Sequence, residues 1–335
     1  MHHKDETVGE HLMHHGHPHS QFHARGRHWA TNRTLHVAVA YSNTSRWRAR
    51  RELFEKFRQE MHRTPNVMLH VGELVIKDQP FEVTEAGHHL DHQFRGNSVL
   101  WHKERLINRV VETFPKDYEY GAYIDADCLF TRYDWAIEAI QKLQVYDWVQ
   151  LFSTYSNLGP HQQVLSTVPS CVKRHMDNAA KPRNYTTSAT GLAWAWRRDA
   201  FDKVGGLMDR CILGSADWHM ALGLIGEVDV SPEVRSIKGP YADYLRAWQA
   251  RASREIRQNV SYIENHAIHY WHGPKAKRKY GERWKILQAN EYNPWVDVYP
   301  DWQGMLQLTN EKPRLRDSIR LYFDERCEDD LSVDP

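Results

Sequence analysis

The segment YGAYIDADCLF, residues 120–130, places two carboxylates, Asp125 and Asp127, between runs of apolar residues. The residues before them are typical of a buried β-strand, and apolar residues follow them as well. Burying paired carboxylates is costly unless a cation or hydrogen bonds compensate for it. The segment therefore indicates either a metal site or a tight turn whose polar ends reach solvent.

The sequence before this segment alternates predicted strands and helices. LHVAVAYS, from Leu35, predicts a buried strand, and VMLHVGELVI predicts a second one. Between them, RWRARRELFEKFRQEMH predicts a helix with one apolar face, made of Leu53, Phe54, Phe57 and Met61. A polar stretch around residues 83–97 leads into SVLWHKERLINRVVETF, a second predicted helix, and EYGAYI is the third predicted strand.

This alternation predicts an α/β fold with a mostly parallel central sheet and flanking helices. Ligands of such sheets bind beyond the carboxyl ends of the strands, which is where Asp125 and Asp127 lie. Further along, WAIEAIQKLQ predicts a helix, DWVQLFS and GLAWAW predict strands, and a helix is expected to begin near Asp217. Residues 273–285 predict a very basic helix, and the last 40 or so residues predict a helical C-terminal extension.

The composition limits the class of protein. Residues 1–33 contain nine of the 22 histidines and almost no aliphatic residues, so we expect a disordered tail followed by one domain, residues 34–335. The 44 Lys and Arg residues balance 43 Asp and Glu residues, which argues against nucleic-acid binding by bulk charge. The four cysteines form no CxxC pair, and no apolar run resembles a signal peptide or a membrane span. We therefore expect a cytoplasmic protein.

Three motifs contain side chains suited to chemistry. Carboxylates in an Asp-x-Asp turn suit Mn²⁺ or Mg²⁺, and imidazoles in HAIHYWHG (His266, His269 and His272) can complete the metal shell. The Lys and Arg residues that follow suit a diphosphate, although a solvated basic helix or contact with nucleic-acid phosphates would have the same composition. Asp217, in GSADWHMA, is either a residue of a helix first turn or a base that deprotonates an acceptor hydroxyl.

These segments follow one another in the order NSVLWHKERLINRVVETFP, YGAYIDADCLF, TGLAWAWRRDAFDKVGGLMD, LGSADWHMA and HYWHGPKAKRKYGERWKIL. This order resembles nucleotide-sugar-dependent glycosyltransferases of the GT-A fold. The likeness is greatest to a group found in bacteria and tailed phages, and it covers roughly residues 35–325. It implies that the chain is an enzyme that transfers a sugar from a nucleoside-diphosphate sugar to a hydroxyl, with Mn²⁺ or Mg²⁺ as cofactor.

The resemblance also implies roles for single residues. Asp125, Asp127 and His272 match the metal ligands, and His269 is the alternative to His272. Asp217 matches the base, although Ala216 stands where inverting members have a second acid, which leaves the stereochemistry open. The implied donor contacts are Tyr41, Asn43, Lys103, His269, Lys277 and Arg278, and the implied acceptor or sugar pocket is Gly191, Trp194, Trp196 and Trp218.

Several alternatives remain at this level. The acceptor is either a glycan or a hydroxymethylated base in phage DNA, for which the basic stretches 46–63 and 273–285 would be suited. A metal-dependent nucleotidyltransferase would also use paired aspartates, but AYSNTSRW lacks the glycine loop that it would need. A non-catalytic carbohydrate- or nucleic-acid-binding domain would explain the aromatic residues but not the combined motifs.

Overall fold

Three β-sheets organise the part of the chain that the computed structural model describes, residues 32–177, 187–309 and 311–333. The largest sheet has seven strands in the order β10-β6-β9-β4-β1-β2-β3. Their bounds are β1 Leu35–Tyr41, β2 Val67–Ile76, β3 Asp91–Gly96, β4 Tyr120–Ile124, β6 Trp148–Gln150, β9 Ala193–Arg197 and β10 Val260–Tyr262. All neighbours are parallel except β9, which runs antiparallel to both β4 and β6. The mostly parallel sheet expected from the sequence is confirmed.

A second sheet, of four strands, has the order β5-β11-β7-β8, and a third has two strands. Their bounds are β5 Cys128–Phe130, β7 Thr154–Leu158, β8 Val164–Pro169, β11 His266–His269, β12 Val298–Pro300 and β13 Leu306–Leu308. Three residues separate the end of β4 from the start of β5, so the second sheet starts at the carboxyl end of a central strand of the first.

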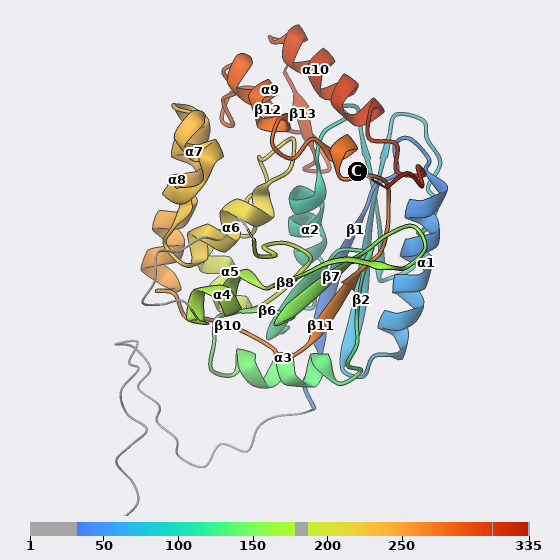
Figure 1. Ribbon diagram of the computed structural model, residues 1–335, viewed down its shortest axis with the longest axis vertical. Coiled ribbons are helices and arrows are strands. Elements are labelled where there is room, and N and C mark those ends of the chain that lie inside the picture. The colour runs from blue at the N-terminus through green and yellow to red at the C-terminus, as the bar shows by residue number, and fades with distance from the viewer. Residues whose placement is uncertain (1–31, 178–186, 310, 334–335) are drawn as a thin grey trace, which may run out of the picture. The chain divides into compact units, whose positions relative to one another are not determined.

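Helices cover both faces of the central sheet, as Figure 1 shows for α1 on one side and α6 and α8 on the other. Their bounds are α1 Arg48–Arg63, α2 Lys103–Val111, α3 Trp135–Leu143, α4 Cys171–Asp177, α5 Arg198–Val204, α6 Ala216–Leu224, α7 Pro232–Ser236, α8 Pro240–Glu255, α9 Arg283–Ala289 and α10 Pro313–Asp324. None of the helices in the described ranges combines the length and the apolar character needed to cross a membrane. Residues 31–335 group into one compact unit. The predicted disordered tail lies almost entirely in residues 1–31, outside the described residues, and stays a prediction.

Alternation along β1 shows why this strand is apolar at most of its positions, His36 being the exception. Val37 and Val39 pack into the core that includes α1 and α3, whereas Ala38 packs into the core on the opposite face. Successive side chains of a strand point to opposite faces, so a strand covered on both sides is mostly apolar on both faces.

The two tryptophans of β9 belong to this buried sheet. Trp194 is 3% exposed and Trp196 is fully buried, and Trp196 stacks on Phe201 with ring centres 4.5 Å apart. The indole N–H of Trp194 donates to the backbone carbonyl of Thr190 at 2.8 Å. The expectation that Trp194 and Trp196 line an acceptor pocket is therefore wrong, because the face of β9 that carries them is covered by helices.

Two elements differ from the sequence-based prediction. Strand β3 lies within the polar stretch 83–97, which gave no strand signal because β3 is an edge strand in which only Phe94 and Gly96 are buried. The basic stretch 273–285 is not one helix. It forms a 3₁₀ turn at Ala276–Arg278, and α9 begins only at Arg283, because Lys279 adopts a left-handed conformation with φ of 46°.

Two histidines on the central sheet contribute to the pH dependence of stability. His36 Nδ1 lies 3.1 Å from His70 Nε2, and the two residues are 6% and 2% exposed. Burial lowers the pKa of both imidazoles, that of His70 to about 3. In the unfolded chain a histidine takes up a proton near pH 6.5, whereas these two buried imidazoles take one up only at lower pH. Below pH 6.5 the unfolded chain therefore binds more protons, and the free energy of unfolding falls.

We therefore expect the free energy of unfolding to fall as the pH drops from 7 to 5. In His70→Leu this decrease should be smaller by about 1–2 kcal/mol, as measured by urea unfolding at each pH. His161→Leu, at an exposed position, is the control and should keep the wild-type pH dependence. An unchanged pH dependence in His70→Leu would contradict this account.

Candidate active site

The turn that follows β4 fixes the two aspartates of YGAYIDADCLF in space. The Asp125 N–H donates to the Leu192 carbonyl at 2.7 Å, and the Cys128 N–H donates to the Asp125 carbonyl at 3.0 Å. Cys128 then opens β5, where it pairs with His269 of β11. The same backbone turn thus directs the Asp125 side chain toward the central sheet and its helices, and places Asp127 beside β11.

Asp125 lies against a cation. Lys103 Nζ, on the first residue of α2, lies 3.1 and 3.2 Å from the two Asp125 carboxylate oxygens, and 3.6 Å from Glu104 Oε1. Burial raises the pKa of Asp125 to about 6 and that of Glu104 to about 7, while Lys103 opposes both shifts. The predicted donor contact Lys103 is therefore occupied by an ion pair with Asp125.

Asp127 lies against two imidazoles. Its Oδ2 is 3.0 Å from His272 Nε2 and its Oδ1 is 3.7 Å from His269 Nε2. The two Nε2 atoms lie 3.2 Å from each other. Burial lowers the pKa of His269 to about 3. It would raise the pKa of Asp127, but the facing histidines hold that carboxyl below its usual range.

These three residues form a group that fits a divalent cation. One ligand atom from each of Asp127, His269 and His272 lies within 4.8 Å of the others, and no other group of this kind occurs among the described residues. Asp127 Oδ1 is buried without a hydrogen-bond partner, and two facing imidazole nitrogens can share only one hydrogen. One carboxylate oxygen with two imidazole nitrogens suits Mn²⁺. The sequence predicted Asp125, Asp127 and His272 as metal ligands. In the structure the third member of the group is His269 rather than Asp125.

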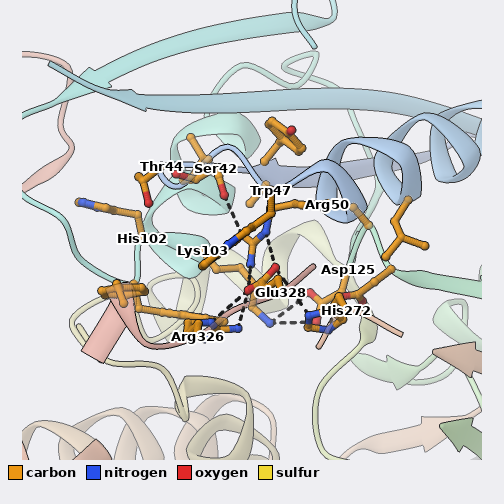
Figure 2. Close-up of a pocket in the computed structure, with 18 of the residues that line it drawn as sticks. Ser42, Thr44, Trp47, Arg50, His102, Lys103, Asp125, His272, Arg326 and Glu328 are labelled. Carbon is orange, nitrogen blue, oxygen red and sulfur yellow. Dashed lines mark hydrogen bonds and ion pairs between the residues drawn. The ribbon is translucent and has the colours of Figure 1, made fainter. Parts of the chain in front are cut away.

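A pocket adjoins this group at the carboxyl ends of β1 and β4 (Figure 2). Its charged lining comprises Arg50, Lys103, Asp125, Asp127, Arg326 and Glu328, and the imidazoles of His102 and His272 also line it. Its remaining lining includes the apolar or aromatic residues Trp47, Leu53, Leu100, Trp101 and Phe323. A pocket with an apolar part next to cationic groups suits a ligand that has both a ring system and phosphates.

Of the two residues expected near the nucleotide base, Tyr41 lines this pocket, and Asn43 lies in the loop beside it. The Tyr41 hydroxyl donates to Glu82 at 2.8 Å. The Asn43 side chain donates to the Trp47 carbonyl at 3.0 Å and accepts from the Trp47 N–H at 2.9 Å. Their polar atoms therefore hold the loop between β1 and α1 in shape, and Trp47 lines the pocket.

Asp217 lies in the first turn of α6, as expected. Its Oδ1 accepts the Trp218 N–H at 2.9 Å, and its charge acts on Lys103, Glu104 and Asp125. Gly191 touches it, since a Cβ atom on Gly191 would lie 2.1 Å from Asp217 Oδ2. The structure therefore brings Asp217 close to the Asp125 side of the site.

The remaining predicted residues differ in their surroundings. The Trp218 indole N–H donates to Ser231 Oγ at 3.1 Å, and the ring packs against the core while staying partly exposed. Arg278 is 4% exposed and donates to the Gly273 carbonyl at 3.1 Å, whereas Lys277 is exposed. Neither Lys277 nor Arg278 lines the pocket in Figure 2.

Sequence reasoning missed four residues of this site, Arg50, Glu104, Arg326 and Glu328. Glu328 is 1% exposed and forms ion pairs with Arg50 and Arg326. Burial would raise its pKa, but Arg50, His272 and Arg326 hold it well below the usual range. Nothing local marks it, because it lies in an acidic C-terminal stretch that reads as solvated.

No protein-family model matches the sequence, and no curated protein matches it. Solved structures do resemble the chain. The catalytic domain of Drosophila β1,4-galactosyltransferase 7 is 15% identical over 58% of this chain and 62% of its own, with a TM-score of 0.31. The mannosyltransferase PcManGT of Pyrobaculum calidifontis, solved with GDP-Man and Mn²⁺, is 15% identical over 78% of this chain and 62% of its own, with a TM-score of 0.38.

A candidate glucose-1-phosphate thymidylyltransferase from Bacillus anthracis also resembles the chain, at 10% identity over 69% of this chain and 87% of its own, with a TM-score of 0.36. Glycosyltransferases are thus among the structures that the chain resembles, as its sequence predicted. Likeness at this level carries no argument about activity, so the function proposed below depends on the geometry of the site.

The ion pair between Lys103 and Asp125 should contribute to the free energy of unfolding in a pH-dependent way. Lys103→Met removes a buried cation from Asp125 and Glu104, and the free energy of unfolding should fall by about 3 kcal/mol at pH 8 in the presence of chelator. The loss should be much smaller at pH 5.5, because both carboxyls can then be neutral. Exposed Lys116→Met is the control, and an equal loss at both pH values would contradict the assignment.

Proposed function

We propose that the chain transfers a sugar from a nucleoside-diphosphate sugar to a hydroxyl acceptor, with Mn²⁺ as cofactor. The observation that carries this proposal is the Asp127, His269 and His272 group beside a partly cationic pocket at the carboxyl ends of β1 and β4. Oxygen and imidazole ligands suit Mn²⁺, and a divalent cation beside a pocket with an apolar side favours a nucleoside diphosphate over a neutral ligand.

Different parts of the site would contact the nucleoside and the diphosphate of the donor. Trp47, Leu53 and Trp101 would contact the nucleoside, because they form the apolar side of the pocket. Asp127 and the two histidines would hold the cation, which when bound neutralises charge on the leaving diphosphate. Lys103 keeps Asp125 ionised and in place at the edge of that region.

Asp217 is the residue we assign to the acceptor hydroxyl. In an inverting reaction it takes the acceptor proton, and in a retaining one it orients the acceptor or stabilises the cationic sugar. Ala216 stands where inverting members of the resembling family have a second acid. Glu104, whose charge interacts with that of Asp217, would supply such a second carboxyl. Gly191 leaves room for the Asp217 carboxylate.

The acceptor class stays a prediction, and it is either a glycan or a hydroxymethylated base in phage DNA. Many arginines of the two basic stretches that suit DNA have internal partners. Arg46 pairs with Glu82, Arg50 pairs with Glu328, and Arg278 and Arg283 are buried. This leaves fewer cations for a nucleic-acid backbone and favours the glycan. A cytoplasmic location likewise stays an expectation.

The test is turnover of nucleotide sugars. A panel of these donors is incubated with Mn²⁺, with Mg²⁺ and with chelator, and release of the nucleoside diphosphate is measured. We expect metal-dependent hydrolysis of one donor, reduced at least about 100-fold in Asp127→Asn and His272→Gln, because loss of a metal ligand removes several kcal/mol of charge stabilisation. His266→Gln is the control, since His266 lies on β11, as His269 does, but its side chain bonds to Thr154.

Other results would point to the alternatives. Pyrophosphate released from a nucleoside triphosphate and a sugar phosphate would instead indicate a nucleotidyltransferase. Metal-dependent binding of a carbohydrate or nucleic acid, with no turnover of any donor, would favour the binding domain. Absence of metal-dependent donor binding and turnover together would overturn the proposal.

The role of Asp217 has its own test. Asp217→Asn should lower kcat about 100- to 1000-fold with little change in the KM for the donor, because it removes a group that acts on the acceptor. Gly191→Ala should act in the same direction by displacing the carboxylate. Gly281→Ala, where a new Cβ meets nothing within 4 Å, is the control. A change confined to the donor KM would contradict the assignment.

A further inference from the structure

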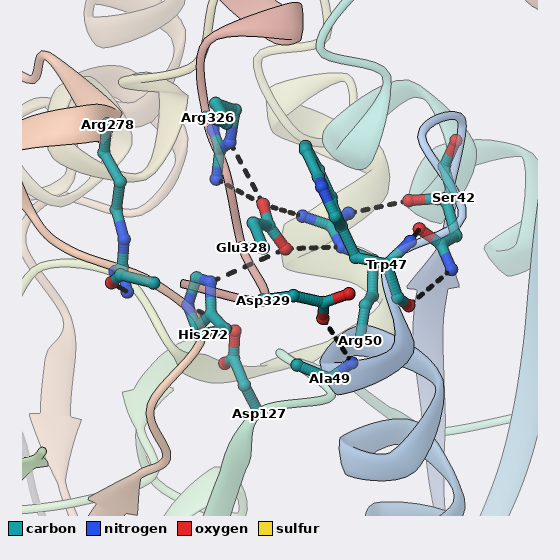
Figure 3. Close-up of polar contacts among 12 residues, drawn as sticks. Ser42, Trp47, Ala49, Arg50, Asp127, His272, Arg278, Arg326, Glu328 and Asp329 are labelled. Atoms are coloured by element: carbon teal, nitrogen blue, oxygen red, sulfur yellow. Dashed lines mark hydrogen bonds and ion pairs between the residues drawn. The ribbon is translucent and has the colours of Figure 1, made fainter. Parts of the chain in front are cut away.

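The acidic C-terminal stretch that follows α10 contains one carboxylate that is removed from water. Glu328 is 1% exposed, and Figure 3 shows it between two arginines from distant parts of the chain. Arg50 Nε and Nη2 donate to its two oxygens at 2.8 and 2.5 Å. Arg326 Nε and Nη2 lie 3.1 and 3.0 Å from Glu328 Oε1. The arginines compensate for the burial of this charge and hold its orientation.

The third neighbour of Glu328 is His272. Its Nδ1 lies 3.7 Å from Glu328 Oε2, slightly beyond hydrogen-bond distance, and has no hydrogen-bond partner. Its Nε2, on the other side of the ring, faces Asp127 and His269. The imidazole of His272 therefore lies between two carboxylates, one in the candidate metal group and one behind it (Figure 3).

A neutral imidazole carries its hydrogen on only one nitrogen. If Nε2 is to be a metal ligand, the hydrogen must be on Nδ1, and a carboxylate facing Nδ1 favours that tautomer. Glu328 is in that position. With its two arginines paired to it, the carboxylate cannot rotate freely, so it also fixes the plane of the ring.

Resting on the function proposed above, we propose that Glu328 is a positioning residue that fixes the tautomer and orientation of His272 for metal binding. By this contact the C-terminal stretch completes a site whose other parts come from β4 and β11. It would not itself be a ligand, because the His272 ring separates it from the metal group.

Separate contacts hold the C-terminal stretch in place, and these allow a matched control. The Asp329 carboxylate accepts the N–H groups of Arg48 and Ala49 at 3.0 and 2.8 Å, at the start of α1. The Trp271 indole N–H donates to the Asp330 carbonyl at 2.8 Å. Asp329→Asn therefore weakens the attachment of the same stretch without changing the group that faces His272.

The first measurement is the bonding of His272 in the protein loaded with diamagnetic Zn²⁺, from long-range ¹H–¹⁵N NMR spectra assigned by comparison with His272→Gln. The metal must be present, because in its absence Asp127 Oδ2, 3.0 Å from Nε2, competes with Glu328 for the hydrogen. In the wild type we expect the metal on Nε2 and a slowly exchanging hydrogen on Nδ1, and in Glu328→Gln faster exchange of that hydrogen. Metal bound through Nδ1, or an equal exchange rate in both proteins, would overturn the proposal. This measurement is also independent of whether the chain transfers sugar.

The second measurement is Mn²⁺ affinity, from the EPR signal of free Mn²⁺ in a titration, with the melting temperature measured on the same samples. Glu328→Gln should raise the Kd about 10- to 100-fold, the usual effect of losing a group that orients a metal ligand. Asp329→Asn should change it less than about threefold. Equal Kd values for wild type and Glu328→Gln, or equal weakening in both variants, would overturn the proposal. If the wild type binds the metal but turns over no nucleotide sugar, the proposed function fails, while these two measurements still decide the role of Glu328. If it binds neither Mn²⁺ nor Zn²⁺, the proposed role of Glu328 fails.

Discussion

Two carboxylates held one residue apart at the edge of a buried sheet are the constraint on which the site depends. Each must be compensated, and like charges so close together cannot share a single cation without cost. The fold separates them. Asp125 is paired with Lys103 from α2, and Asp127 with two imidazoles contributed by β11 and the loop that follows it. The pair therefore forms two sites with different chemistry, a salt bridge and a candidate metal centre.

This separation explains why the chain needs a second sheet. The register of β5 with β11 sets His269 opposite Cys128, next to Asp127, and the Tyr270 N–H donates to the Asp127 carbonyl at 2.9 Å. His272 then returns to the same carboxylate three residues later. The C-terminal stretch lies on the opposite side of the His272 ring from Asp127, where Glu328 stands between His272 and Arg50 of α1. Segments from four distant parts of the sequence thus converge on the end of β4.

The sequence predicted those features that have a local periodicity or a position at a strand end. The apolar runs of β1, β2 and β4 and the apolar face of α1 mark the parallel sheet, and the aspartates mark its ligand-binding edge. Features decided by long-range contacts were not predictable. Arg326 lies two residues before Glu328, but nothing near Glu328 shows that Arg50 also pairs with it, and the choice of His269 beside Asp127 depends on strand register. Trp194 and Trp196 were misassigned for the same reason, because only the packing of helices on β9 shows that they are buried.

The central claim is that Asp127, His269 and His272 together hold the metal. Electron spin echo envelope modulation of bound Mn²⁺ tests it most directly, since ¹⁴N nuclei of coordinated imidazoles modulate the echo. The account predicts modulation from two histidine nitrogens, with the contribution of one nitrogen lost in His269→Gln. Bound Mn²⁺ with no nitrogen modulation, coordinated by oxygen alone, would contradict it.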